Sequence, residues 1–130
     1  MILKPFMALC LAAGLSSVAN ADEAGRAEYL ASCASCHGEA GAGDGPLAEM
    51  MTVPVPGLTG LSAANDGAFP MLETIQVIDG RTGMRGHGYP MPVWGARYKA
   101  EAMGAGDYSA EIRARGRVLS LALYLQSIQE

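Results

Sequence analysis

Cysteine and histidine are scarce in this chain of 130 residues, which contains three Cys and two His. Long apolar runs are absent as well. No stretch reaches the roughly 20 residues that a membrane-spanning helix needs, so we expect no permanent membrane anchor. Basic side chains are outnumbered, with nine against 13 acidic ones and a formal net charge of −4. Because nucleic-acid-binding proteins present a basic surface, this charge argues against a nucleic-acid partner.

The N-terminus has the three-part pattern of a secretory signal peptide. Lys4 supplies a positive charge, a short apolar run covers residues 6–15, and Ala19-Asn20-Ala21 forms a small-x-small cleavage signal. We therefore expect residues 1–21 to be removed as the signal peptide and residues 22–130 to form the mature domain. The expected location is the periplasm, and the loss of Lys4 leaves a net charge of −5.

The pattern along the mature chain indicates a small all-α domain. Helix-compatible stretches alternate with loops that are rich in glycine and proline. The predicted helical segments are residues 22–35, 47–51, 70–79 and 109–128, and the predicted loops include 38–46 and 83–95.

Two of these helices have an expected apolar side. In the helix over 70–79 it consists of Met71, Leu72, Ile75 and Ile78. In the last helix, Ser109 is the expected N-cap, and the apolar positions are Ile112, Leu119, Leu123 and Tyr124. The arginines of this helix (Arg113, Arg115 and Arg117) most simply form its solvated face, and a local basic patch for an acidic partner is the alternative.

The segment Cys33-Ala34-Ser35-Cys36-His37 carries the chemistry. C-x-x-C-H is the attachment signature of c-type haem. Two thiols one helical turn apart can add to the two vinyl groups on one edge of a porphyrin, and the adjacent imidazole then faces the iron. The sequence therefore predicts one covalently attached haem c on Cys33 and Cys36, with His37 as an axial iron ligand.

Other uses of this segment fit less well. A zinc site would need a second pair of ligands, and the mature chain offers only His87 besides this cluster. A thioredoxin-like redox pair would need a strand before it and a βαβ pattern around it. A structural disulfide between Cys33 and Cys36 would give His37 no role.

Met91 is the expected ligand on the other haem face. It lies between Pro90 and Pro92, whose fixed φ angles stiffen the loop and lower the entropy cost of presenting the sulfur. His/Met ligation is common in cytochromes c. The competing ligand is His87, which is flanked by glycines. Three other methionines (Met50, Met51 and Met71) are expected to fill the core.

Together these features resemble the class I cytochrome c family over essentially the whole mature chain. The haem motif, the segment Met91-Pro92-Val93-Trp94-Gly95, and Leu121-x-x-Tyr124-Leu125 are similar to the attachment site, the distal loop and the C-terminal helix of that family. The resemblance implies the small cytochrome c fold, in which the N- and C-terminal helices cross and loops wrap one haem. It also implies that the aromatic residue of the last helix crosses a glycine of the first, for which Gly25 and Tyr29 are suitable.

The middle of the chain is similar to a bacterial subgroup of this family through residues 41–46 and 78–81. This similarity implies that the Pro46 carbonyl accepts a hydrogen bond from Nδ1 of His37 and fixes the imidazole. The side chains considered as neighbours of the haem propionates are Trp94, Tyr98, Arg81, Arg85 and Arg97, although a solvated surface role is equally open for each arginine.

The expected function is one-electron transfer rather than catalysis, because two axial ligands leave no open position on the iron. Weak and transient redox protein partners are expected, since a carrier must leave after each transfer. A tightly bound cytochrome subunit of a periplasmic dehydrogenase or reductase is an alternative. A haem sensor or peroxidase-like enzyme is a further, less favoured one.

Overall fold

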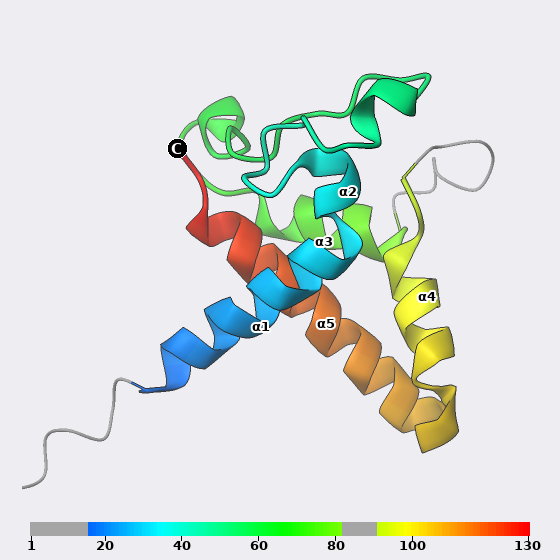
Figure 1. Ribbon diagram of the computed structural model, residues 1–130. Coiled ribbons are helices and arrows are strands. Elements are labelled where there is room, and N and C mark those ends of the chain that lie inside the picture. Colours follow the sequence, from blue (N-terminus) through cyan, green and yellow to red (C-terminus); the bar gives the residue numbers. More distant parts are fainter. Residues whose placement is uncertain (1–15, 82–90) are drawn as a thin grey trace, which may run out of the picture.

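The computed structural model describes residues 16–81 and 91–130, and every regular element within these ranges is helical. The expected all-α class is therefore confirmed (Figure 1). The α-helices are α1 (Ser16–Ser32), α2 (Ala34–His37), α3 (Met71–Asp79), α4 (Trp94–Glu101) and α5 (Asp107–Ser127), and the 3-10 turns are η1 (Ala48–Met50), η2 (Ala63–Asn65) and η3 (Met103–Ala105). In the described part of the chain, no helix has the length and apolarity required to cross a bilayer.

The crossing of α1 and α5 is the largest contact between helices (Figure 1). A Cβ added to Gly25 would overlap the Ser120 carbonyl oxygen and lie 2.7 Å from Cβ of Tyr124, so α1 approaches α5 as closely as a backbone can. One turn later, the rings of Tyr29 and Tyr124 lie with their centroids 5.2 Å apart. The expected glycine–aromatic crossing is present, and it places the C-terminal end of α1 over the middle of the domain.

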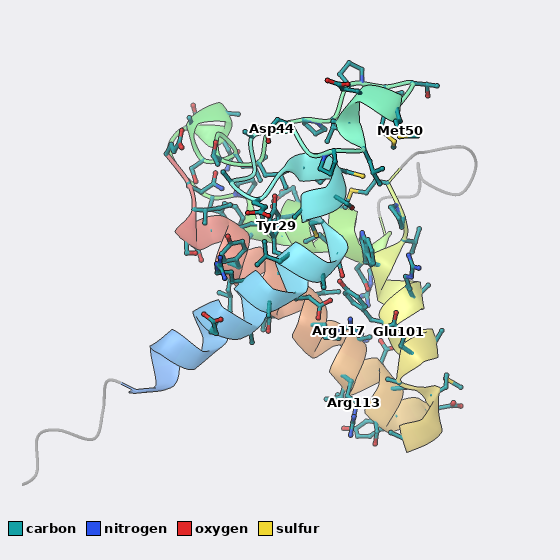
Figure 2. The ribbon with its side chains drawn as sticks, in the orientation of Figure 1. Tyr29, Asp44, Met50, Glu101, Arg113 and Arg117 are labelled. Carbon is teal, nitrogen blue, oxygen red and sulfur yellow. The ribbon has the colours of Figure 1, made fainter. Side chains whose placement is uncertain are left out.

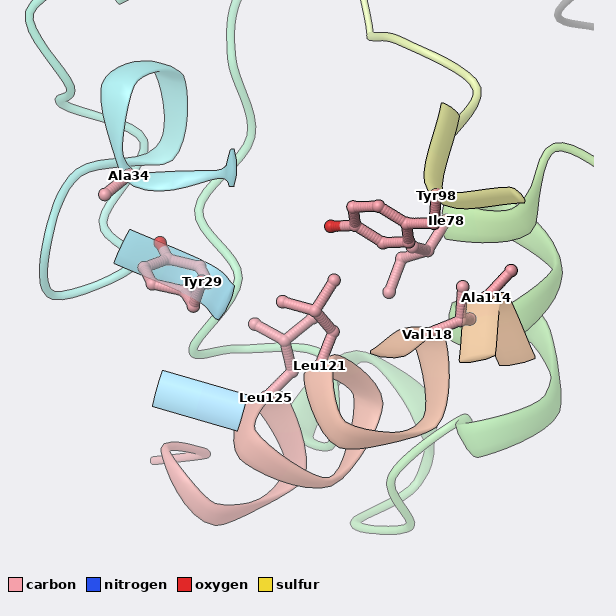
Figure 3. Close-up of a cluster of buried hydrophobic side chains, with 8 residues drawn as sticks. All are labelled: Tyr29, Ala34, Ile78, Tyr98, Ala114, Val118, Leu121 and Leu125. Atoms are coloured by element: carbon pink, nitrogen blue, oxygen red, sulfur yellow. The ribbon is translucent and has the colours of Figure 1, made fainter. Parts of the chain in front are cut away.

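The buried face of α5 differs from the expected one. Ile112 and Leu119 are 52% and 46% exposed, whereas the core side consists of Ala110, Ala114, Val118, Leu121, Ala122 and Leu125. The helix is packed against α1, α3 and α4, and small side chains let several helices approach it closely. The core of the domain, drawn in Figure 3, consists of Tyr29, Ala34, Ile78, Tyr98, Ala114, Val118, Leu121 and Leu125.

The start of α5 also differs from the prediction. Gly106, at φ +85°, precedes the helix, and Asp107 is its first residue. Asp107 places a negative charge in the first turn, where the helix dipole favours it. Ser109, the expected N-cap, therefore lies inside the helix.

The predicted helix at 70–79 is confirmed as α3, which ends at Gly80 in the left-handed conformation (φ +86°). Its buried residues are Thr74 and Ile78. Leu72 is 62% exposed and does not belong to the apolar side to which it was assigned. The reason is its position two residues before Thr74, which places it on nearly the opposite side of a 3.6-residue turn.

Helix α4 was not predicted, because its start was assigned to a loop that extends to Gly95. Two close contacts hold this start against the end of α3. A Cβ on Gly80 would overlap the side chain of Val93, and a Cβ on Gly95 would overlap the side chain of Asp79. Because neither glycine position has room for a side chain, α4 begins at a fixed place directly after Met91-Pro92-Val93.

Candidate haem-binding site

The two cysteines lie where α1 passes into α2. The Cys33 amide donates to the Tyr29 carbonyl at 2.8 Å, and the His37 amide donates to the Cys33 carbonyl at 2.9 Å, so the helical path continues through this segment. Cys33 and Cys36 are therefore one turn apart, and both are free thiols. Burial raises the pKa of the Cys33 thiol to about 12. The predicted attachment pair is thus presented from one side of a rigid helical segment.

His37 is oriented by a carbonyl group, but not by the one that was expected. Its side chain is buried (8% exposed), and Nδ1 donates to the Pro56 carbonyl at 3.0 Å. The assignment to Pro46 was wrong. Pro46 is exposed, because the chain turns back after Gly45 and brings residues 55–57 alongside the histidine. The hydrogen bond at Nδ1 leaves Nε2 as the ring nitrogen that can bind iron.

The glycine-rich loop after His37 closes the end of α2. The amides of Gly43, Gly45 and Leu47 donate to the last carbonyls of this segment, those of His37, Cys36 and Ser35 respectively. A Cβ on Gly45 would lie 2.5 Å from the Ala34 carbonyl oxygen, so only glycine fits there. The loop therefore satisfies the free carbonyls of the helix end and stabilises the segment that carries the cysteines.

Met91 is half-buried and packs against the hydrophobic core. Cys33, Ile75 and Trp94 border the same core and are also only partly buried. His87 and Arg85 lie outside the described residues, so the choice between Met91 and His87 stays a prediction. The use of Met50 as core filler was wrong, because this side chain is 77% exposed.

The residues considered for the propionates have different surroundings from one another. Tyr98 is only 1% exposed, and its hydroxyl donates to Oγ of Ser32 at 3.1 Å. Trp94 stacks near Tyr98 with centroids 5.6 Å apart, and the Arg97 guanidinium lies 5.2 Å from the Trp94 ring. Arg81 is paired with Asp79. These contacts make Tyr98 part of the interior rather than of a solvated rim.

Arg117 joins three helices and is not part of a simple solvated face. Its Nε and Nη2 each donate to Glu28 of α1 at 2.8 Å, and Nη1 donates to Glu101 of α4 at 2.6 Å. The guanidinium carbon also lies 3.7 Å from the centroid of the Tyr98 ring. Burial acts to raise the pKa of Glu28, but its hydrogen bonds, chiefly those from Arg117, outweigh burial and hold the pKa below its usual value. No local sequence signal identifies this network, because Arg117 lies 16 residues from Glu101 and 89 residues from Glu28 in the chain.

Charge is divided unevenly along the chain. Between Arg26 and Arg81 there is no lysine or arginine, while the same interval contains seven acidic residues. Two of them, Asp44 and Glu49, line a groove of about 560 Å³ beside the glycine-rich loop. Arg117 and its ion-pair partner Glu101 lie on other elements, well away from Asp44 in Figure 2. The acidic half of the chain therefore contains the haem motif.

Exposed apolar side chains accompany these acids. Leu47 is 42% exposed, Val53 is 46% exposed, and both belong to the segment around η1 together with Met50. The Leu47 amide donates to the Ser35 carbonyl, so this segment is attached directly to the helix of the cysteines. We refer to Asp44, Leu47, Glu49, Met50 and Val53 as the attachment face.

The residues present fit a covalently held haem. The two thiols are not joined to each other, one imidazole nitrogen is already fixed, and partly buried apolar side chains border the site. The buried Thr74 hydroxyl has no hydrogen-bond partner among the described residues. Within those residues there is also no cluster of three or more His, Cys, Asp or Glu side chains that could hold a metal ion by itself. His37 is then suited to bind the iron of a porphyrin.

Comparison with known proteins gives one finding. The sequence model of the family described as cytochrome c matches residues 23–105, which is more than half of the chain. No curated protein and no solved structure shows significant similarity to it. The match includes the C-x-x-C-H segment, the glycine-rich loop, α3 and α4. The members of this family bind haem c covalently, and this chain belongs to the cytochrome c family.

Proposed function

We propose that the protein is an exported one-electron carrier that holds haem c on Cys33 and Cys36, with His37 and Met91 as axial ligands. The observation that carries the proposal is the segment from Cys33 to His37. Its thiols are one turn apart, and its imidazole is oriented by Pro56. Family membership supports electron transfer with haem, while the ligand set and the periplasmic location remain part of the proposal.

When bound, haem c supplies the Fe(III)/Fe(II) couple. The chain has three tasks. Cys33 and Cys36 tether the group, His37 presents Nε2 from a ring whose orientation is fixed by the bond at Nδ1, and Met91 presents a thioether from a loop between two prolines. Because the ligands need not change between the two oxidation states, little rearrangement accompanies transfer. A thioether ligand and an apolar surrounding favour the ferrous form and raise the potential.

The attachment face is the proposed docking surface. It combines exposed apolar side chains with Asp44 and Glu49, and no basic residue occurs in the surrounding 54-residue interval. Apolar contact gives weak adhesion, and charge complementarity guides the encounter. The redox partner is therefore expected to present a basic surface and to dissociate after each transfer.

The experiment that tests the function is a visible spectrum with a redox titration of the purified protein. We expect one haem that titrates as a single one-electron couple and a sulfur-to-iron charge-transfer band in the oxidised form. Met91→Ala removes this band and lowers the potential, whereas Met50→Ala, the control at an exposed methionine, changes neither. If the wild-type protein lacks this band and His87→Ala changes the spectrum, His87 is the ligand instead.

The alternative of a tightly bound enzyme subunit is tested by size. A free carrier elutes from gel filtration of native extract near the mass of this small chain, whereas a subunit elutes in a large complex. An open iron site, as in a sensor or a peroxidase-like enzyme, predicts that Met91→Ala leaves the spectrum and the potential unchanged.

A further inference from the structure

One connected set of side chains joins the helix before the haem motif to the helix after Met91. It contains Glu28 and Ser32 of α1, Tyr98 of α4 and Arg117 of α5. Ser32 directly precedes Cys33, and α4 begins three residues after Met91. The set therefore connects the two segments that are proposed to bind opposite faces of the haem.

The hydrogen bonds run without a gap between these two segments. The Tyr98 hydroxyl donates to Ser32 at 3.1 Å, and the Ser32 hydroxyl donates to Oε1 of Glu28 at 3.0 Å. The Arg117 guanidinium holds the same carboxylate through two bonds of 2.8 Å. Two parallel bonds between arginine and a carboxylate fix orientation as well as distance.

Arg117 also fixes α4 directly. Its guanidinium carbon lies 3.7 Å from the centroid of the Tyr98 ring, and its Nη1 bonds Glu101 one turn further along α4. The Tyr98 ring is 1% exposed and the Arg117 side chain is 35% exposed, so the stacking is partly shielded from water, which strengthens the attraction between a cation and an aromatic ring. Helix α4 is thereby held at two successive turns.

The start of α4 has its own fixed contacts, those of Val93 with Gly80 and of Gly95 with Asp79. With both its start and its later turns held, α4 cannot shift along or rotate about its axis without breaking one of these contacts. Any such shift would move Met91, which lies three residues before the helix and packs against the same core.

We propose that Ser32, Glu28, Tyr98 and Arg117 form a brace that sets the distance between the His37 side and the Met91 side of the haem, so that Arg117 and Tyr98 are positioning residues for the sulfur ligand. This inference rests on the proposed ligation by Met91. It predicts that loosening the brace lets Met91 leave the iron more easily while the protein stays folded.

Imidazole titration of the oxidised holoprotein measures this directly, because added imidazole binds iron only when Met91 dissociates. Arg117→Gln removes the charge and the stacking, and we expect the apparent imidazole affinity to rise about tenfold. Arg115→Gln is the matched control, since Arg115 is two residues away, is exposed and, among the residues that the structure describes, pairs only with Glu111 on the same helix. We expect its imidazole affinity to stay within twofold of wild type.

A second variant keeps the test independent of folding losses. Tyr98→Phe retains the ring beneath the guanidinium and removes only the hydroxyl, so we expect a rise of about threefold in imidazole affinity. Thermal unfolding followed by circular dichroism is measured for every variant. If these residues have a purely structural role, both Arg117→Gln and Tyr98→Phe will lower the unfolding temperature and leave the imidazole affinity unchanged. That result would overturn the proposed role of the brace.

Failure of the proposed function has a different signature. If the wild-type protein shows no sulfur-to-iron band, the ligation by Met91 is wrong, and the brace is overturned with it. If the wild type shows the band, and Arg117→Gln and Arg115→Gln bind imidazole equally, the ligation stands and only the brace is wrong.

Discussion

Gly25 of α1 lies against Tyr124 of α5 so closely that a Cβ at position 25 would be 2.7 Å from the tyrosine Cβ and would overlap the Ser120 carbonyl. This contact sets how near α1 comes to α5. It also sets the distance between the cysteine segment and the core, because that segment follows directly from α1.

Gly25→Ala is expected to destabilise the protein. Overpacked cores typically lose about 1–3 kcal/mol, and here the neighbours are backbone atoms that cannot rotate away. The measurement is the free energy of unfolding in denaturant. Gly116→Ala is the control, because nothing lies within 4 Å of a Cβ there, and replacing an exposed helical glycine should stabilise by up to about 1 kcal/mol. Equal effects of the two substitutions would contradict the close approach of the helices.

Tyr29→Phe tests how the end of the haem motif is held. The Tyr29 hydroxyl donates to the Gly38 carbonyl at 2.6 Å in the interior, directly after His37. Because that carbonyl also accepts from the Gly41 amide, we expect a loss of about 1 kcal/mol, or roughly 4–8 °C in unfolding temperature for a domain of this size. Tyr108→Phe, at a side chain that is 81% exposed, should change the unfolding temperature by less than about 1 °C. A loss at Tyr108 as large as that at Tyr29 would contradict this account.

Glu28 gives the protein a defined acid sensitivity. The pKa of Glu28 is held below its usual value, so its contribution to stability is present above the unfolded pKa of about 4.3 and is lost as the pH falls through the lower folded pKa. Glu28→Gln should lower the unfolding temperature at neutral pH, and the gap from wild type should narrow on acidification. Glu23→Gln, at an exposed residue of the same helix, serves as the control. A gap that is constant from about pH 7 to pH 3 would show that Glu28 does not stabilise through its charge.

The covalent attachment is tested by extraction. After denaturation in acidified acetone, the wild-type pigment should stay with the protein, because thioether bonds survive this treatment. We expect the single variants Cys33→Ser and Cys36→Ser to keep their pigment through the remaining bond, and the double variant to release all of it. Colourless wild-type protein after washing would show that the haem is not covalently attached, and would contradict the proposed site.

The polarity of the attachment face is tested with small redox reagents. At low ionic strength, the cation tris(1,10-phenanthroline)cobalt(III) should oxidise the wild-type protein about threefold faster than it oxidises Glu49→Lys, because two units of charge change beside the site. Anionic ferricyanide should show the opposite change. Asp107→Lys makes the same change in charge at the start of α5 and should leave both rates nearly unaltered. Equal responses of the two variants would mean that transfer occurs on another face.

Local features of the sequence predict much of the fold. C-x-x-C-H, the helix that ends at Gly80 and the crossing at Gly25 each depend on residues whose spacing or size is visible in the sequence. Helix α4 could not be predicted in this way, because it has glycine at its second position and no clear apolar stripe. Its position depends on contacts with Asp79 and Ser32, which are distant in the sequence.

Large apolar residues were misleading on α5. The expected face contained Ile112 and Leu119, but the core side consists mainly of alanines and leucines that let three helices approach. Hydrophobicity identifies which residues can be buried, whereas the positions of the neighbouring helices determine which side of α5 is covered. The acceptor for His37 was misassigned for a related reason, since the choice between Pro46 and Pro56 depends on how the glycine loop folds back.

The contact between Gly80 and Val93 brings together the two ends of the intervening stretch of chain. A stretch whose ends already touch can be lengthened, shortened or exchanged without separating the helices on either side of it. The protein could thus acquire a different potential or partner through changes between these two residues alone, with the scaffold of α1, α3, α4 and α5 left as it is.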